Sequence, residues 1–450
     1  MKRYLRPQLA FSLSLALLPA VVIAAAPGAP SDSLPERPTF YRDVLPILQG
    51  NCQDCHREAG NSNSGMVAPM ALGEYDEVRP WAKSIAKVTA ARDMPPWFPA
   101  PEFHGQFEEE RGLTEAEIET LQRWARTGAP AGSADEAPPP RQFPSPAGWT
   151  LGEPDVVIPI PEPYWVADEI EDIQPSFEVV LSEEQLPADR WIHWIEFRPG
   201  NPKLVHHGGA RVQTLDAAGK PVSDPIAGGK IIGTAPGDGP DVWPVGYGKL
   251  VRKGSKIVFG LHYHKEPGPG TGGWDQSTLA IKWHTEPVKH VVRSAGVSSR
   301  GWEIPPYHTN WQVGAARTFE EDSYILNMMP HMHTRGKHAL YELVYPDERR
   351  ETILYVPRYN YNWQLTYSFK EPKFVPAGTR LEVTMTFDNS TGNPFLIEGP
   401  ERAVGFGGMT TDEMNIGWTE YANAKPIEDV SRHDFGTAGS GVEDVDDDSP

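Results

Sequence analysis

The stretch KIVFGLHYH, residues Lys256–His264, shows the pattern that dominates the second half of the chain. Successive side chains of an extended strand point to opposite faces. Four apolar side chains therefore share one face of this stretch: Ile257, Phe259, Leu261 and Tyr263. His262 and His264 share the other face. The pattern predicts a half-buried strand whose polar face presents two imidazoles to a metal ion.

Similar short segments recur from about residue 150 onward, for example at residues 177–181 and 190–197. Prolines and glycines separate them, and long helical periodicity is almost absent. Short alternating strands with such turns are typical of antiparallel β-sandwich or jelly-roll domains. We therefore expect the chain after residue 150 to be β-structured.

A weak internal repeat divides this region. LVRKG at residues 250–254 resembles FVPAG at 374–378, which lies 124 residues later. The histidine pair at 206–207 similarly precedes the pair that begins at His331 by 125 residues. The shared order predicts two β domains of similar topology, over residues 150–295 and 300–432.

The first residues carry the features of a secretory signal. A basic start, MKR, precedes an apolar run from Leu9 to Ile23 and three alanines that end at residue 26. This order predicts a cleaved signal peptide over residues 1–26 and a periplasmic or secreted protein, with an uncleaved anchor as the alternative. Because no later segment reaches the roughly 20 apolar residues of a spanning helix, no stable membrane association is expected after cleavage.

The charge balance excludes one class of partner. The chain has 41 basic and 61 acidic residues, which gives a formal charge of −20. Such a charge repels phosphate backbones, so no nucleic acid is expected as a partner. Part of the charge lies in residues 433–450, whose acidic ending VEDVDDDSP predicts a solvated, disordered tail.

The two cysteines of the chain form the motif CQDCH at residues 52–56. Two cysteines do not build the disulfide framework of an exported protein. A C-x-x-C-H motif instead attaches a c-type haem: the thiols of Cys52 and Cys55 bond to the vinyl groups, and His56 takes the proximal iron position. A redox-active C-x-x-C disulfide and a chance match are the alternatives.

The sixth iron ligand has several candidates within the same expected domain: Met66, Met70, Met94 and His104. Met94 is favoured because the sequence DMPPW places it on a proline-held loop after a helical stretch from about Glu77 to Ala91. The alternative is that Met94 packs against the haem edge.

A small all-α cytochrome domain is therefore predicted over residues 37–131. Its closing helix begins at the capping box TEAE, residues 114–117, continues with apolar residues at helical spacing, and ends before Gly128. The proline-rich segment 132–149 predicts a stiff linker to the β domains.

Six of the 14 histidines fall into three tight clusters: His206 with His207, His262 with His264, and His331 with His333. Clustering of imidazoles favours metal binding. Two histidines that lie two positions apart on an extended segment project to the same side, a common way to hold a metal such as Cu(II) or zinc.

Four motifs occur in the order of a known enzyme family: VHHG at residues 205–208, LHYH at 261–264, PHMHTRGK at 330–337 and DEM at 412–414. With IPP at residues 304–306, they make the chain resemble the ascorbate-dependent type II copper monooxygenases, the family of dopamine β-hydroxylase and peptidylglycine α-hydroxylating monooxygenase. The resemblance covers residues 150–425. Each motif is modest alone, and the specificity comes from their order.

The resemblance implies two copper ions with the following ligands: His206, His207 and His262 for one, and His331, His333 and Met414, the catalytic set, for the other. The all-histidine site stores and delivers an electron, whereas the methionine site binds O2 and inserts oxygen into an activated C–H bond. The two sites are implied to face each other across a cleft between the domains. A thioether favours Cu(I), the form that reacts with O2. Only the resemblance singles out Met414 among ten methionines.

The expected protein is an exported copper monooxygenase with two copper ions and one covalently bound haem c. It acts on a small-molecule substrate with O2. We expect the haem domain to relay electrons from a donor, either an ascorbate-like reductant or a redox protein. The animal enzymes are cross-linked by disulfides that this chain cannot form, so their substrate-contacting loops are not transferable.

Two other classes of protein remain open. The first is a non-catalytic haem- and copper-containing electron-transfer or metal-binding protein, although a blue-copper site would need a cysteine thiolate. The second is a zinc or non-haem iron enzyme with Asp412 or Glu413 as a carboxylate ligand. His264, beside an expected ligand, is predicted to support the ligands or to lie at the surface.

Overall fold

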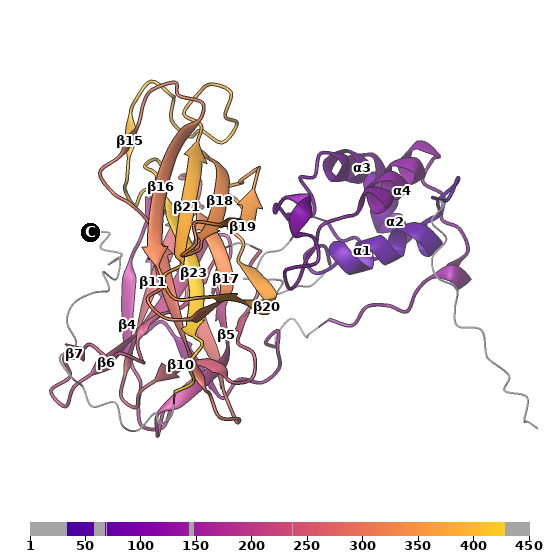
Figure 1. The fold of residues 1–450 in the computed structure, drawn as a ribbon. Coiled ribbons are helices and arrows are strands. Elements are labelled where there is room, and N and C mark those ends of the chain that lie inside the picture. Colours follow the sequence, from indigo (N-terminus) through magenta and orange to yellow (C-terminus); the bar gives the residue numbers. More distant parts are fainter. Residues whose placement is uncertain (1–33, 58–67, 69, 144–147, 236, 428–450) are drawn as a thin grey trace, which may run out of the picture.

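The computed structural model describes residues 34–57, 68, 70–143, 148–235 and 237–427. The predicted signal peptide and acidic tail lie outside these ranges. The described chain is mostly β-sheet, an elongated body of packed sheets with a group of short helices beside it (Figure 1). Within the described ranges, no helix has both the length and the apolar character needed to cross a membrane.

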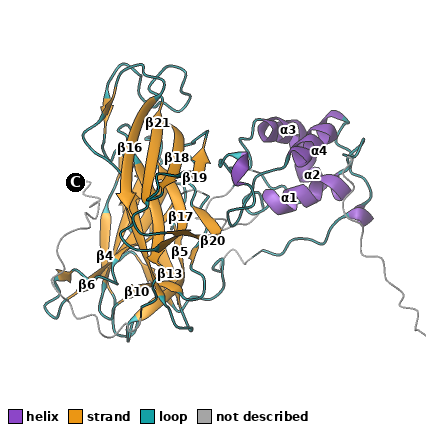
Figure 2. Ribbon diagram, viewed as in Figure 1, coloured by secondary structure: helices purple, strands orange, loops and turns teal. Residues whose placement is uncertain are grey.

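The helices all come from the first part of the chain and lie on one side of the β body (Figure 2). They are η1 (Phe40–Val44), α1 (Leu45–Asn51), α2 (Tyr75–Val78), η3 (Arg79–Trp81), α3 (Ala82–Ala90), η4 (Pro101–Phe103), α4 (Glu115–Arg126) and η5 (Ala134–Glu136). The core shared by η1, α1, α2, α3 and α4 contains the fully buried Phe40, Leu121 and Trp124. The helical stretch expected after Glu77 is confirmed, since α2, η3 and α3 follow one another directly.

The predicted capping box at the start of α4 is also confirmed. Thr114 Oγ1 accepts the N–H of Glu117 at 3.3 Å, and the Glu117 carboxylate accepts the N–H of Thr114 at 2.8 Å. These two bonds satisfy backbone donors that have no partner inside the helix. Gly128, with a φ of 91°, follows the end of the helix as expected.

The first β-sandwich packs two sheets over one apolar core. One sheet consists of β1 (Val156–Pro159), β13 (Thr278–Trp283), β5 (Arg190–Arg198) and β10 (Tyr247–Val251), in that order. The other has β3 (Asp172–Ile173) and β4 (Ser176–Val180) on one side of β11 (Lys256–His264), and β6 (Val205–Leu215) and β8 (Gly229–Thr234) on the other. β11 has the predicted bounds. Its predicted apolar face is buried in the core between the sheets, with Phe259 and Tyr263 fully enclosed.

The second β-sandwich has the same arrangement. One sheet consists of β14 (His290–Val297), β23 (Ile416–Asn423), β17 (Ser323–His331) and β20 (Tyr367–Val375). The other consists of β16 (Trp311–Thr318), β21 (Arg380–Phe387), β18 (Gly336–Val344) and β19 (Arg350–Val356). Of the remaining short strands, β9 (Asp241–Val242) pairs with β5 and β7 (Pro221–Val222) with β6 in the first sandwich. β2 (Tyr164–Val166) pairs with β12 (Gly273–Asp275), and β15 (Glu303–Ile304) with β22 (Val404–Gly405).

The two sandwiches repeat one topology, as the sequence predicts. β10 and β20 each lead through a tight turn into a strand of the opposite sheet, β11 and β21. The turns place Gly254 at a φ of 73° and Gly378 at 82°, a conformation that strains any residue with a Cβ atom. This requirement explains the glycine shared by LVRKG and FVPAG.

The sandwiches are joined by a seam in one continuous nine-stranded sheet. β10 pairs in parallel with β14, Tyr247 opposite His290, and β14 pairs with β23 on its other side. The sequence places the domain boundary between residues 295 and 300. β14 begins before that point and pairs with β23, so it belongs with the second sandwich.

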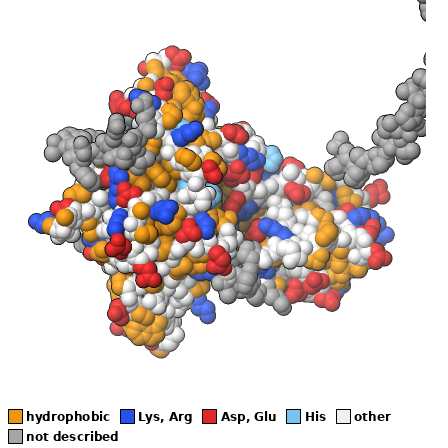
Figure 3. Space-filling view, turned by 90° about the horizontal axis from the view of Figure 1, so that it is seen from below, with side chains coloured by type: hydrophobic (Ala, Val, Ile, Leu, Met, Phe, Trp, Pro, Cys, Tyr) orange, Lys and Arg blue, Asp and Glu red, His pale blue; other side chains and the backbone are white. Residues whose placement is uncertain are grey.

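The helical group is anchored to the second sandwich. Phe98 and Phe107 in loops, and Phe103 at the end of η4, enter the core of this sandwich. Burial of an aromatic side chain stabilises by about 1.5–3 kcal/mol, so these contacts fix the position of the group. Elsewhere the surface is mixed, with acidic and basic side chains interspersed on the face seen in Figure 3.

Candidate metal centres

Three of the predicted ligands converge in the first sandwich. His206 and His207 begin β6, and His262 on β11 pairs directly with His207 across the sheet. One nitrogen of each ring lies within 4.8 Å of one nitrogen of each of the other two. A β-bulge after His262 shifts the register at this point. Adjacent strands thus bring together residues that lie far apart in the sequence.

The free nitrogens of this cluster suit a metal ion. Among the described residues, no hydrogen-bond partner exists for His206 Nε2 or His262 Nδ1, although both atoms are buried. Burial, with the neighbouring His262, lowers the pKa of His206 to about 3, and burial also lowers the pKa of His207. Neutral imidazoles with unused lone pairs are the form that binds metal. The residues present therefore fit a copper ion.

Asp172 orients the cluster, and the sequence analysis did not identify it. Its carboxylate accepts a hydrogen bond from His262 Nε2 at 2.8 Å and one from Thr410 Oγ1 at 2.6 Å. Burial alone raises the pKa of Asp172, but bonds from His262 and His264 hold it well below its usual range. Because Nε2 of His262 donates to Asp172, Nδ1 is left as the ligand atom. His264 lies 3.6 Å from the same carboxylate, as expected of a supporting residue.

The second cluster lies where β17 ends. The rings of His331 and His333 are perpendicular, with centroids 5.4 Å apart. Met332 between them is fully buried in the core of the second sandwich, so the two histidines project away from that core. His331 Nδ1 donates to Gln364 Oε1 at 2.5 Å, and His333 Nδ1 donates to the carbonyl oxygen of Asp412 at 3.2 Å. These bonds through Nδ1 orient both rings, and Nε2 of His333 is the atom that a metal would use.

Met414 is tied to this cluster through Glu413. One carboxylate oxygen of Glu413 accepts the backbone N–H of His333 at 2.8 Å and that of Met414 at 3.2 Å. The other oxygen accepts the N–H of Arg335 at 2.6 Å. Burial raises the pKa of Glu413 to about 8. Both oxygens accept backbone N–H groups, so Glu413 holds the backbone of this segment in place.

The two clusters are in contact with each other. The ring centroids of His207 and His331 lie 6.0 Å apart, and Tyr361 stacks on His206 at 4.8 Å. Tyr361 also lies edge-on to His333, at 6.4 Å. The resemblance implies two sites that face each other across a cleft. The structure instead joins the five histidines into one group at the junction of the sandwiches.

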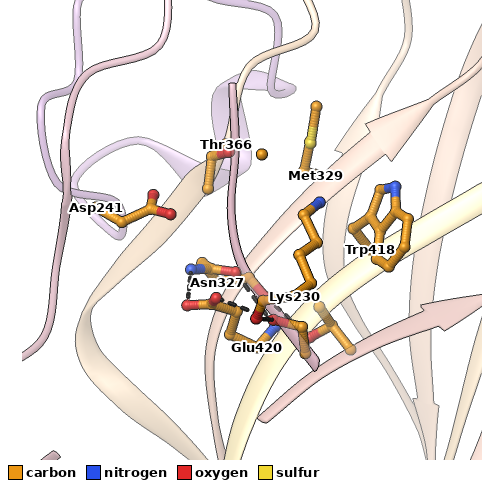
Figure 4. A pocket seen from close by; sticks show the side chains of 10 residues that line it. Lys230, Asp241, Asn327, Met329, Thr366, Trp418 and Glu420 are labelled. Carbon is orange, nitrogen blue, oxygen red and sulfur yellow. Dashed lines mark hydrogen bonds between the residues drawn. The ribbon is translucent and has the colours of Figure 1, made fainter. Parts of the chain in front are cut away.

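A polar cavity lies beside this group on the same sheet face. Met329 and Trp418 form a cross-strand pair of β17 and β23 that lies two positions from the pair His331 and Ile416. They line a space of about 20 Å³ together with Lys230, Asp241, Asn327, Thr366 and Glu420 (Figure 4). This volume admits one water molecule. The Lys230 ammonium lies 3.9 Å from the centroid of Trp418.

The C-x-x-C-H motif follows the end of α1. The N–H groups of Cys55 and His56 both donate to the carbonyl oxygen of Cys52, at 3.2 and 3.0 Å, which forms a tight turn. His56 Nδ1 donates to the Met70 carbonyl oxygen at 3.1 Å, so Nε2 is left for iron. Burial raises the pKa of the Cys52 thiol to about 12, unlike the lowered pKa of a redox-active C-x-x-C pair. These residues fit a covalently attached haem.

The candidates for the sixth iron ligand differ in their surroundings. Met94 is partly exposed and follows α3, and Met70 packs against the helical core. His104 is exposed and pairs with Glu110, away from that core. Met66 lies outside the described residues. Met94 remains the candidate on a loop beside the helical group.

Comparisons with known proteins give no family. No family model matches the chain, and no curated protein matches it. Among solved structures, it is similar to PNGF-II (10% identity, 59% of this chain and 66% of that chain, TM-score 0.28). It is also similar to recombinant peptide: N-glycanase F (10%, 60% and 98%, TM-score 0.23) and to the VP2 subviral particle of infectious bursal disease virus (10%, 60% and 72%, TM-score 0.19). These low scores carry no conclusion about function.

The residues that orient the ligands could not be identified from the sequence motifs. Asp172, Tyr361 and Gln364 belong to none of the four motifs. Gln364 and Tyr361 do lie in an aromatic and amide-rich segment, YNYNWQ, which the structure places between β19 and β20. Polar residues in such a segment were the available signal, but their partners lie far away in the sequence.

Proposed function

We propose that the chain is an exported copper monooxygenase that carries its own haem c unit. The proposed reaction hydroxylates an activated C–H bond of a small molecule with O2 and two electrons. The histidine group at the sandwich junction supports this proposal above all. Among the described residues, it holds two buried imidazole nitrogens without a hydrogen-bond partner, His206 Nε2 and His262 Nδ1, at positions that the family resemblance assigns to copper.

The ligand chemistry separates the two proposed copper sites. One copper ion would be held by His206, His207 and His262. A ligand set made only of imidazoles can coordinate both Cu(I) and Cu(II). His331, His333 and Met414 would hold the other, where the thioether favours Cu(I). When bound, copper supplies one-electron redox chemistry and O2 binding. The protein's part is to fix the orientation of the imidazoles, His262 through Asp172 and His331 through Gln364.

The haem unit suits the role of electron relay. Cys52 and Cys55 would attach the haem, His56 would ligate its iron, and Met94 is the proposed sixth ligand. Hydroxylation consumes two electrons per turnover, whereas haem and copper each exchange one. A donor fixed to the same chain would supply electrons from an ascorbate-like reductant or a redox protein without a separate encounter.

Metal and haem analysis tests the proposal. We expect the purified exported protein to contain two copper ions and one haem per chain and to consume O2 when a reductant is present. His331→Ala should lose one copper ion and the O2 consumption, while His308→Ala, at an exposed position, should retain both. Zinc in place of copper, or full copper content in the His331→Ala variant, would refute the assignment.

A further inference from the structure

The helical group and the second sandwich share backbone hydrogen bonds. The N–H of Ala100 donates to the carbonyl oxygen of Tyr355 at 2.8 Å, and the N–H of Glu108 donates to that of Ser368 at 2.8 Å. In return, the N–H of Lys370 donates to the carbonyl oxygen of Gln106 at 3.0 Å. Phe107 also forms an isolated bridge with Phe369. Segment 96–111 is therefore a fixed part of the sandwich edge.

An aromatic contact crosses this boundary close to the proposed iron ligand. Trp97 lies three positions after Met94, and its ring packs edge-on against Tyr367 with centroids 5.3 Å apart. Tyr367 is buried at the start of β20, where it pairs with Met328 of β17. The side chain of Trp97 thus links the loop of Met94 to the strand that ends at His331.

The loop of residues 357–366 continues this link to the histidine group. At one end, Arg358 donates to the carbonyl oxygens of Ala91 and Arg92, at 2.7 and 2.8 Å, just after α3. Further along, Tyr361 stacks on His206 and Gln364 accepts a hydrogen bond from His331. The same loop leads directly into Tyr367. It therefore contacts the helical group and both histidine clusters.

We infer that the contact between Trp97 and Tyr367, continued by the loop that carries Gln364, is the electron bridge from the haem unit to the copper sites. This inference rests on the proposed function. In the step, ferrous haem iron loses one electron and becomes ferric, and a cupric ion gains it and becomes cuprous. No proton moves and no covalent bond changes. Electron transfer weakens steeply across gaps, and this route offers packed rings, covalent backbone and a hydrogen bond throughout.

Anaerobic stopped-flow spectroscopy on the full chain tests the bridge. Protein with measured haem and copper contents receives one equivalent of dithionite, and the reoxidation of ferrous haem by Cu(II) is followed by absorbance. Trp97→Leu and Tyr367→Leu should each slow this reoxidation several-fold, because each variant replaces a packed ring on the route with a smaller aliphatic side chain. Trp97→Phe keeps an aromatic ring and should restore most of the rate.

Phe369→Leu is the matched control, because Phe369 packs on Phe107 in the same interface and lies outside the proposed route. It should leave the rate unchanged. A Trp97→Leu variant that reoxidises as fast as the parent would overturn the bridge, as would equal slowing by Phe369→Leu. Protein without bound copper or haem would refute the proposed function instead, and the bridge with it.

Discussion

The two sandwiches repeat one topology, yet they hold their histidines in different ways. In the first, three imidazoles come from two adjacent strands, β6 and β11, and one of them donates to the carboxylate of Asp172. In the second, His331 and His333 lie at the end of a strand and in the following loop, and donate to an amide and to a backbone carbonyl oxygen. The histidines near the start of β6 and those at the end of β17 therefore have different electrostatic surroundings, although the two sandwiches share one topology.

This difference has a chemical consequence. A carboxylate that accepts the N–H of a ligating histidine makes the ring a stronger donor, which favours the more highly charged Cu(II). A neutral acceptor has a weaker effect, and a thioether ligand favours Cu(I). In the proposed function, a copper ion in the first cluster would therefore deliver its electron readily, and one in the second would be held as the Cu(I) that reacts with O2. Substitutions that alter the ligand surroundings of one cluster should therefore affect the two clusters differently.

The largest effect is expected from Met414→Ile. The loss of the thioether should lower product formation by about 100-fold or more, beyond the effect usual for residues that only orient ligands. The haem and the copper ion of the first cluster should remain. Product formation and metal content per chain are the measurements. Met409→Ile, at an exposed methionine in the same region, should keep full activity, and full turnover in Met414→Ile would rule out that residue as a ligand.

The contrast between the clusters was only partly predictable from the sequence. Strand β11 was predicted with its bounds, because its alternation has a period of two and its apolar face is uninterrupted. The histidine clusters were predicted because paired imidazoles are rare elsewhere in the chain. The repeat could be detected in the sequence because both equivalent turns require a glycine, Gly254 in one and Gly378 in the other.

The orienting residues were not predictable in the same way. Asp172 lies 90 positions from His262, and Gln364 lies 33 positions from His331. No local pattern joins them, since strand pairing and loop packing bring them together only in the folded chain. The contact between the two clusters also arises from the seam at β10 and β14, a parallel pairing that no periodicity indicates.

Asp172→Asn tests the first side of the contrast. The neutral amide removes the charge that faces His262, so copper affinity of the first cluster should fall by about 10- to 100-fold while the second cluster keeps its copper. Competition with a copper chelator measures the two affinities. Glu171→Gln changes the same charge at the exposed neighbouring position and should have no effect. Equal weakening at both clusters would show that Asp172 serves mainly to join the sandwiches through Thr410.

Gln364→Glu tests the other side by giving the second cluster a carboxylate. Gln364 is buried and already accepts the N–H of His331, so an ionised glutamate would reproduce the arrangement of Asp172 and His262. The added basicity of His331 should favour Cu(II) and lower the reduction potential of that copper by about 60 mV, which corresponds to a tenfold change for one electron. Potentiometric titration followed by electron paramagnetic resonance measures the shift.

Asn362→Asp is the control, because it adds a charge at an exposed position of the same loop without contact to the ring. It therefore separates the effect of the hydrogen bond from that of nearby charge. An equal shift in both variants would mean that net charge, and not the hydrogen bond to the histidine, distinguishes the two clusters.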